Sequence, residues 1–215
     1  MGLELAARVP AFRLLLITDR KLAGRPLPEV VQEALSAVAP GSVAIQLREK
    51  DLDTRPLLDL ASALLPLCRA RNAPLLVNDR IDIALALGLD GVHLPHASFK
   101  ANDARRQLGP EKLVGVSCHS VAEVQDAKAR RASYATFGPL FDTPSKRAFG
   151  PPVGLEELGR ASAVGLPLYG LGGVTSVTAL QVRQHGAVGV AAIGAWLGAQ
   201  DTGGAVQRLI ATLPG

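Results

Sequence analysis

The sequence predicts a single-domain (β/α)8 barrel, the TIM barrel, an α/β fold of eight parallel strands surrounded by helices. Short apolar runs alternate with longer amphipathic stretches along all 215 residues, which favours parallel strands joined by helical crossovers. About 25 residues per strand–helix unit is typical of a compact barrel. An open, doubly wound sheet is the structural alternative, but Thr18-Asp19-Arg20-Lys21 stands where its glycine-rich turn would follow the first strand.

The expected strands are short, mostly apolar runs that end in polar residues or glycine. In chain order they are Leu14–Thr18, Val43–Leu47, Leu75–Asn78, Gly91–Leu94, Leu113–Ser117, Tyr134–Phe137, Leu168–Leu171 and Val188–Ile193. The expected helices carry their apolar residues on one stripe. They are Pro28–Ala39, Arg55–Arg71, Ile81–Leu87, Ala101–Leu108, Val121–Arg131, Leu155–Ala163, Val177–Gln184 and Ala205–Leu213. No linker or shift in composition divides the chain, so one domain is expected over residues 1–215.

Charge, cysteine content and apolar runs exclude several classes of protein. The formal charge is only +4, and no block of Lys and Arg is interleaved with aromatic residues, so no nucleic-acid partner is expected. Cys68 and Cys118 are the two cysteines and have neither metal-binding nor disulfide-framework spacing. No targeting leader and no apolar run of about 20 residues is present, so we expect a cytoplasmic protein without a membrane partner.

Polar residues end the second strand, at the rim where such a barrel carries its active site. Gln46, Arg48 and Lys50 share one face because side chains alternate along a strand. A guanidinium and an ammonium on that face predict a bound anion, although a solvated strand end is the alternative.

Glycines follow the last two strands. Gly172-Gly173 and Gly194-Ala195 predict a phosphate site built from backbone amides. The alternative is that these glycines only serve tight turns.

Asp79 follows the third strand and has two interpretations. It is either a magnesium ligand or the N-cap of the following helix. A magnesium site usually includes a second carboxylate nearby, and after the fourth strand the sequence has Ser98 instead.

His119 is the best candidate for a general acid or base, because imidazole titrates near neutral pH and this residue follows the fifth strand. His93 is interpreted as a hydrogen-bonded structural histidine and His185 as a helix C-cap. Cys118 is interpreted as a core thiol rather than a nucleophile.

Taken together, the strand ends resemble the thiamine phosphate synthase/TenI superfamily over nearly the whole chain. The shared landmarks are Gln46-Leu47-Arg48-Glu49-Lys50, Asn78-Asp79-Arg80, Asp90-Gly91-Val92-His93-Leu94, Gly115-Val116-Ser117, Phe137-Gly138-Pro139-Leu140-Phe141, Lys146 and Gly172-Gly173. The resemblance implies a (β/α)8 barrel that acts in thiamine biosynthesis on a small phosphorylated thiazole. It adds Asn78, Ser117 and Lys146 to the substrate-binding residues, and an assembly of identical subunits is compatible with it.

Two branches of this superfamily differ in their reaction. The synthase joins hydroxymethylpyrimidine diphosphate to a thiazole phosphate, releases pyrophosphate, and uses two magnesium-binding aspartates. One of these matches Asp79 and the other falls at Ser98. The segment Leu94–Phe99 is more similar to the TenI branch, whose members include the thiazole tautomerase, and His119 occupies the place of that branch's histidine.

We therefore expect a thiazole tautomerase, an isomerase that needs no cofactor. In this hypothesis His119 moves the proton that converts a carboxylated thiazole phosphate to its aromatic form. The first alternative is a thiamine phosphate synthase, a transferase that requires Mg²⁺, since Arg48, Lys50 and Lys146 also suit a diphosphate. The second is a non-catalytic regulatory protein that binds thiazole phosphate.

Overall fold

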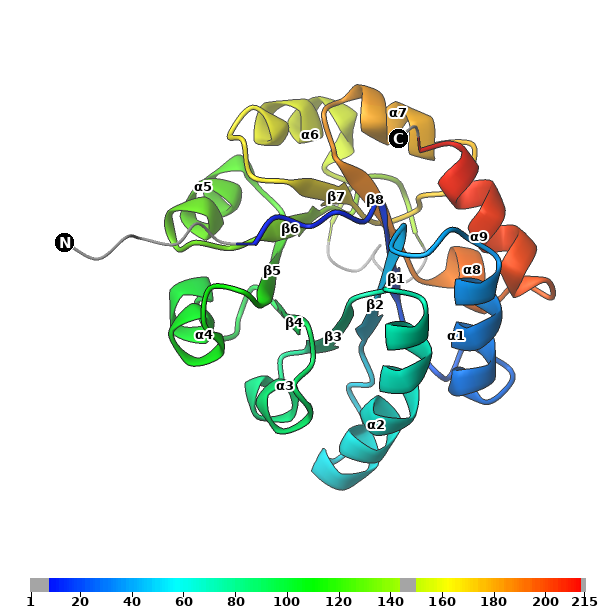
Figure 1. Cartoon of the computed structure of the whole chain (residues 1–215). Helices are drawn as coiled ribbons and strands as arrows, with labels where there is room; N and C mark the ends of the chain where they lie inside the picture. The colour runs from blue at the N-terminus through cyan, green and yellow to red at the C-terminus, as the bar shows by residue number, and fades with distance from the viewer. Residues whose placement is uncertain (1–7, 144–149, 214–215) are drawn as a thin grey trace.

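Eight parallel strands close into a barrel in the computed structural model, which describes residues 8–143 and 150–213 (Figure 1). The strands follow chain order around the barrel, and β8 closes it by pairing with β1. They are β1 (Leu14–Ile17), β2 (Val43–Leu47), β3 (Leu75–Asn78), β4 (Gly91–Leu94), β5 (Leu113–Cys118), β6 (Tyr134–Phe137), β7 (Leu168–Gly170) and β8 (Gly189–Ala192). The predicted fold class is confirmed.

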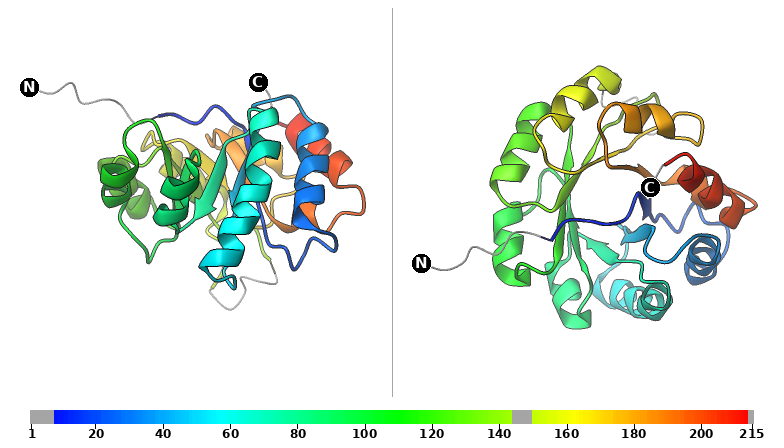
Figure 2. Two further views of the ribbon diagram at one scale, coloured as in Figure 1. Left: turned by 60° about the horizontal axis from the view of Figure 1, so that its bottom comes forward. Right: turned by 45° about the horizontal axis from the view of Figure 1, so that its top comes forward.

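Helices surround the strands on the outside, as two further views show (Figure 2). They are α1 (Leu27–Ser36), α2 (Thr54–Ala70), α3 (Ile81–Leu87), α4 (Ala101–Leu108), α5 (Val121–Ala129), α6 (Gly154–Ser162), α7 (Ala179–Gln184), α8 (Gly194–Leu197) and α9 (Thr202–Ala211). No helix in the described ranges is both long and apolar enough to span a membrane.

Alternation along the strands divides the core into two layers. On β2, Val43, Ile45 and Leu47 belong to the large apolar layer between strands and helices. Ala44 belongs instead to a smaller cluster inside the barrel. The face predicted for Gln46 and Arg48 is therefore the face that points into the lumen.

Three aromatic rings fill the amino-terminal end of the lumen. Phe12 stacks on Tyr169 with a centroid separation of 4.8 Å, and Tyr134 meets both rings edge-on. All three are buried, and Phe12 comes from the segment that crosses this end of the barrel before β1 (Figure 1). The polar part of the lumen is thereby confined to the carboxyl-terminal end of the strands.

A helical turn that the sequence did not predict, α8, directly follows β8. Its Trp196 is fully buried, and the indole Nε1 donates to the carbonyl oxygens of Ala192 at 3.1 Å and Ile17 at 3.3 Å. Burial of this indole between β8 and β1 holds the turn, and Ile193, predicted to be in the strand, becomes its N-cap. A four-residue helix is too short to show helical periodicity in a sequence.

Candidate active site

One layer of polar side chains lies in the lumen, on the carboxyl-terminal side of the aromatic rings. It contains Gln46, Asn78, His93, Ser117 and Thr136, each at a lumen-facing position of a different strand. Neighbouring strands bring them together: Asn78 pairs with His93 in register, and Ser117 pairs with Thr136. The structure thus gathers Gln46, Asn78 and Ser117, three predicted substrate-binding residues, at one level.

His93 is the central group of this layer and, as predicted, is buried and hydrogen-bonded. Its Nδ1 lies 3.1 Å from the Tyr134 hydroxyl, and its Nε2 lies 3.0 Å from Ser117 Oγ. Burial, followed by the nearby positive charge of Arg48, lowers the pKa of His93 to about 3. The imidazole is therefore neutral at physiological pH.

Gln46 has one unsatisfied atom in this layer. Its Nε2 donates to Asn78 Oδ1 at 3.2 Å, but Oε1 is buried and accepts no hydrogen bond from the described residues. A buried carbonyl oxygen without a donor costs about 1–3 kcal/mol. A molecule that donates a hydrogen bond at this depth would therefore bind favourably.

Arg48 lies one alternate position above Gln46 and is half-buried. Its guanidinium has no hydrogen-bond or ion-pair partner within residues 8–143 and 150–213. A half-buried guanidinium in this state favours an anionic ligand. Lys50 is exposed in the turn after β2, and Lys146, also predicted to bind substrate, lies outside the described residues.

The backbone of Arg48 is held by two residues to which the sequence analysis gave no role. Thr18 is fully buried; its hydroxyl accepts from the Arg48 N–H at 2.9 Å and donates to Glu49 Oε1 at 2.6 Å. The Glu49 carboxylate, 5% exposed, also accepts from the Arg20 backbone and guanidinium. The sequence signal for this network was a threonine and a glutamate at the ends of adjacent strands.

Asp79 and Ser98 are in direct contact, the Ser98 hydroxyl donating to Asp79 Oδ1. Asp79 has a positive φ of 63°, a conformation that Asp tolerates better than most residues. Its backbone N–H donates to the His93 carbonyl, which fixes it beside β4. The structure therefore brings the Ser98 hydroxyl beside Asp79. The interpretation of Asp79 as the N-cap of the following helix was wrong, because the N-cap of α3 is Arg80.

The two glycine loops lie on adjacent strands, since β7 pairs with β8. Gly172 has φ +95°, and a Cβ there would meet Pro139 Cα at 2.6 Å; Gly173 is similarly close to Phe141. The first loop therefore needs glycine for close packing. The amide nitrogens of Gly172, Gly173, Gly194 and Ala195 nevertheless donate no hydrogen bond to another described residue, so they are available to a phosphate.

His119 is exposed at the rim, but its contacts are with the loop after β6 and with α5 rather than with the lumen layer. Its Nδ1 lies 2.5 Å from the Gly138 carbonyl oxygen, and its backbone N–H donates to Glu123. Its ring stands 6.3 Å from that of His96. His185 is the C-cap of α7, as predicted.

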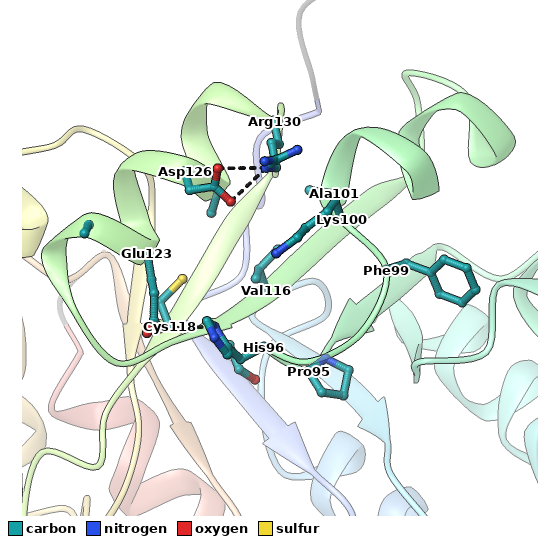
Figure 3. A pocket seen from close by; sticks show the side chains of 13 residues that line it. Pro95, His96, Phe99, Lys100, Ala101, Val116, Cys118, Glu123, Asp126 and Arg130 are labelled. Atoms are coloured by element: carbon teal, nitrogen blue, oxygen red, sulfur yellow. Dashed lines mark hydrogen bonds and ion pairs between the residues drawn. The ribbon is translucent and has the colours of Figure 1, made fainter.

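A pocket of about 230 Å³ lies between α4 and α5, against β5, and Ser117 is among the residues that line it (Figure 3). On its edge Arg130 pairs with Asp126 at 2.8 Å, and His96 Nδ1 lies 3.5 Å from a Glu123 carboxylate oxygen. Arg48 and the glycine loops are not among its lining residues, so the lumen rim remains the better candidate for a phosphorylated ligand.

Sequence and structure comparisons relate this chain to known proteins. A family model described as thiamine monophosphate synthase matches residues 14–196. The thiamine-phosphate synthase of Roseiflexus castenholzii is 48% identical and covers 90% of this chain and 84% of its own. That of Moorella thermoacetica is 43% identical, covering 94% and 95%. The structure of a thiamine phosphate pyrophosphorylase from Pyrococcus furiosus matches with a TM-score of 0.85, 33% identity, and coverage of 95% and 96%.

Proposed function

The chain belongs to the thiamine monophosphate synthase family, and on that basis we propose that it joins hydroxymethylpyrimidine diphosphate to a thiazole phosphate and releases pyrophosphate. The observation that carries the proposal is the convergence of an unneutralised Arg48 and two glycine loops with free amides at one rim. Two anionic groups need two anchoring regions, and this rim offers both.

The expectation of a thiazole tautomerase was wrong. Relatives from 36% to 48% identity include several named thiamine-phosphate synthase, so the findings support a transferase and not an isomerase. The expectation depended on the missing carboxylate at Ser98 and on His119. Ser98 still offers an oxygen beside Asp79, and His119 contacts loop groups instead of the lumen layer, so neither residue excludes a synthase.

The reaction breaks the bond between the pyrimidine methylene carbon and the diphosphate oxygen, and pyrophosphate leaves with the electron pair. The thiazole nitrogen then supplies its lone pair to the same carbon. Negative charge grows on the departing oxygens, so the half-buried Arg48 stabilises the transition state more than the ground state. Gly172 and Gly173 amides anchor the thiazole phosphate, and Gln46, Asn78 and Ser117 line the depth that the ring reaches.

The oxygen donors at Asp79 suit Mg²⁺, which is commonly held by one or two carboxylates together with substrate phosphates. Within the described ranges no group of three His, Cys, Asp or Glu residues is arranged to hold a metal, so substrate oxygens must complete the shell. Asp79 and Ser98 would hold the ion. When bound, Mg²⁺ would neutralise charge on the diphosphate and so favour its departure.

Purified protein incubated with both substrates and Mg²⁺ is expected to form thiamine phosphate and pyrophosphate, measured by chromatography and by a coupled phosphate assay. Arg48→Met removes the charge but keeps an unbranched side chain, and should lower kcat/KM by about 100-fold or more.

Arg130→Met is the matched control, because Arg130 pairs with Asp126 on α5, away from the lumen. It should leave kcat/KM unchanged. The proposal fails if the unaltered protein forms no thiamine phosphate, and the role of Arg48 fails if both variants behave alike.

A further inference from the structure

A chain of hydrogen bonds runs through the lumen from the aromatic rings to the rim. The Tyr134 hydroxyl lies 3.1 Å from His93 Nδ1, and Ser117 Oγ lies 3.0 Å from His93 Nε2. Thr136 Oγ1 is more distant from Nε2, at 3.4 Å. Tyr134 and His93 are buried, whereas Ser117 is partly exposed.

The direction of each hydrogen bond follows from the hydrogens that must be satisfied. Burial raises the pKa of the Tyr134 hydroxyl well above its ordinary value, so the group keeps its proton. His93 Nδ1 is its only hydrogen-bond partner in the described part of the chain. A buried O–H without an acceptor is costly, so Tyr134 donates to Nδ1.

Because Nδ1 accepts the Tyr134 hydrogen, the imidazole carries its proton on Nε2, which donates to Ser117 Oγ. One lone pair of Ser117 is thus occupied, and its own hydrogen is directed away from His93 toward the rim. Arg48 and Ser117 both occupy lumen-facing positions at the carboxyl-terminal ends of β2 and β5, so an anion held by Arg48 lies over the same mouth of the barrel as Ser117.

We propose that Tyr134 and His93 are positioning residues that fix the Ser117 hydroxyl as a hydrogen-bond donor to a diphosphate oxygen. The inference rests on the function proposed above for the identity of the ligand. Neither residue touches the reacting atoms; both act through Ser117. The arrangement selects a ligand that presents an acceptor at this point over one that presents a donor.

The tautomer is measured without any substrate. Protein labelled with ¹⁵N-histidine contains four histidines, and the signals of His93 are those lost in His93→Gln. Long-range ¹H–¹⁵N spectra at pH 7 should show the neutral form protonated on Nε2. A proton on Nδ1, or a cationic ring, overturns the proposal.

Binding of inorganic pyrophosphate in the presence of Mg²⁺, followed by calorimetry, measures the consequence. Tyr134→Phe and Ser117→Ala should each raise Kd by about tenfold, and the double variant should raise it no further than Ser117→Ala alone. Additive effects would mean that Tyr134 does not act through Ser117.

Tyr169→Phe is the matched control. It removes a buried hydrogen bond from a neighbouring tyrosine, whose hydroxyl donates to the Phe12 carbonyl at 2.7 Å, and it does not touch His93. Its Kd for pyrophosphate should equal that of the unaltered protein; a tenfold rise in Tyr169→Phe would mean that Tyr134 has only a packing role.

Neither measurement depends on turnover. A protein that binds pyrophosphate but forms no thiamine phosphate would therefore refute the proposed reaction and leave the hydrogen-bond assignment unaffected.

Discussion

Ser98 is the residue on which the assignment of the reaction turned. A hydroxyl in contact with Asp79 supplies a neutral oxygen where a carboxylate would supply a charged one. Magnesium is a hard cation and binds charged oxygen more strongly. A Mg²⁺ ion bound here would therefore depend more on substrate oxygens than an ion held by two carboxylates.

Ser98→Asp is expected to lower the Mg²⁺ concentration for half-maximal activity by about tenfold, because it adds a second carboxylate beside Asp79. Without Mg²⁺ the two like charges repel, so the melting temperature should fall in metal-free buffer and recover when Mg²⁺ is added. Ser98→Ala controls for loss of the hydroxyl alone. An unchanged Mg²⁺ requirement in Ser98→Asp would place the ion elsewhere.

His93 makes stability depend on pH. Its pKa is about 3 in the folded protein against an ordinary value of 6.5. As the pH falls below 6.5, His93 becomes protonated in the unfolded chain but not in the folded one. Its contribution to the free energy of unfolding is therefore fully present above pH 6.5 and is lost as the pH falls toward 3. Between pH 7 and 5.5 the loss from this residue should be about 1 kcal/mol. Urea titrations of the unaltered protein and of His93→Gln at both pH values measure this loss. Equal losses of stability in the two proteins would contradict the assignment to His93.

Several of these residues could be identified from the sequence because strand alternation fixed their direction. Gln46 and Arg48 were predicted to share one face of the second strand, and that face points into the lumen, whereas Ser117 was named from the family resemblance. Thr18 and Glu49 were missed because their role is a contact between two strands, which no local pattern reports. Tyr134 was missed for a related reason: a tyrosine in an apolar strand is ordinary core until its hydroxyl is found against His93.

Among the elements, the loop after β7 is the one most constrained by packing. Its Gly172 and Gly173 lie against the Pro139–Phe141 segment after β6, with positive φ angles. The loop after β8 is open by comparison, because a Cβ on Gly194 would meet no atom within 4 Å. The two predicted glycine loops therefore differ: packing dictates glycine in one and not in the other.

Gly172→Ala is expected to lower the free energy of unfolding by about 1–3 kcal/mol, since the added Cβ overlaps Pro139 and the backbone strains. Gly194→Ala should change it by less than about 0.5 kcal/mol. Chemical denaturation of both variants tests the contrast. Equal stabilities would mean that the β6 and β7 loops separate easily.

The positions of the helices and strands could be predicted from hydrophobic periodicity, but the residues at which they begin and end could not. The predicted strand Val188–Ile193 is observed as Gly189–Ala192, and Ile193 is instead the N-cap of α8, whose Trp196 is buried. Packing between distant segments decided both boundaries, and such packing leaves no local signal.

At the scale of the whole molecule, the closed barrel was predictable because strand–helix alternation and unit length both favour it.

The reactivity of the two cysteine thiols shows whether the barrel is folded. Cys68 and Cys118 are free and almost completely buried, and burial raises the pKa of each to about 12. Neither forms a reactive thiolate at neutral pH while the barrel is closed.

An aromatic disulfide reagent at pH 8 should therefore leave the native protein unmodified over minutes and titrate both thiols in guanidinium chloride. Added pyrophosphate and Mg²⁺ should slow any native labelling, because a ligand that binds the folded state reduces opening. Fast native reaction of Cys118, which lines the pocket between α4 and α5, would show that these helices separate without global unfolding.

The rings of Phe12, Tyr134 and Tyr169 give the barrel a floor. A molecule that reaches Gln46 is in a dead end and must return through the mouth by which it entered. In the proposed reaction, the substrate whose ring lies deeper is therefore expected to bind first. Pyrophosphate and thiamine phosphate would leave through the same mouth, so their release is expected to be ordered.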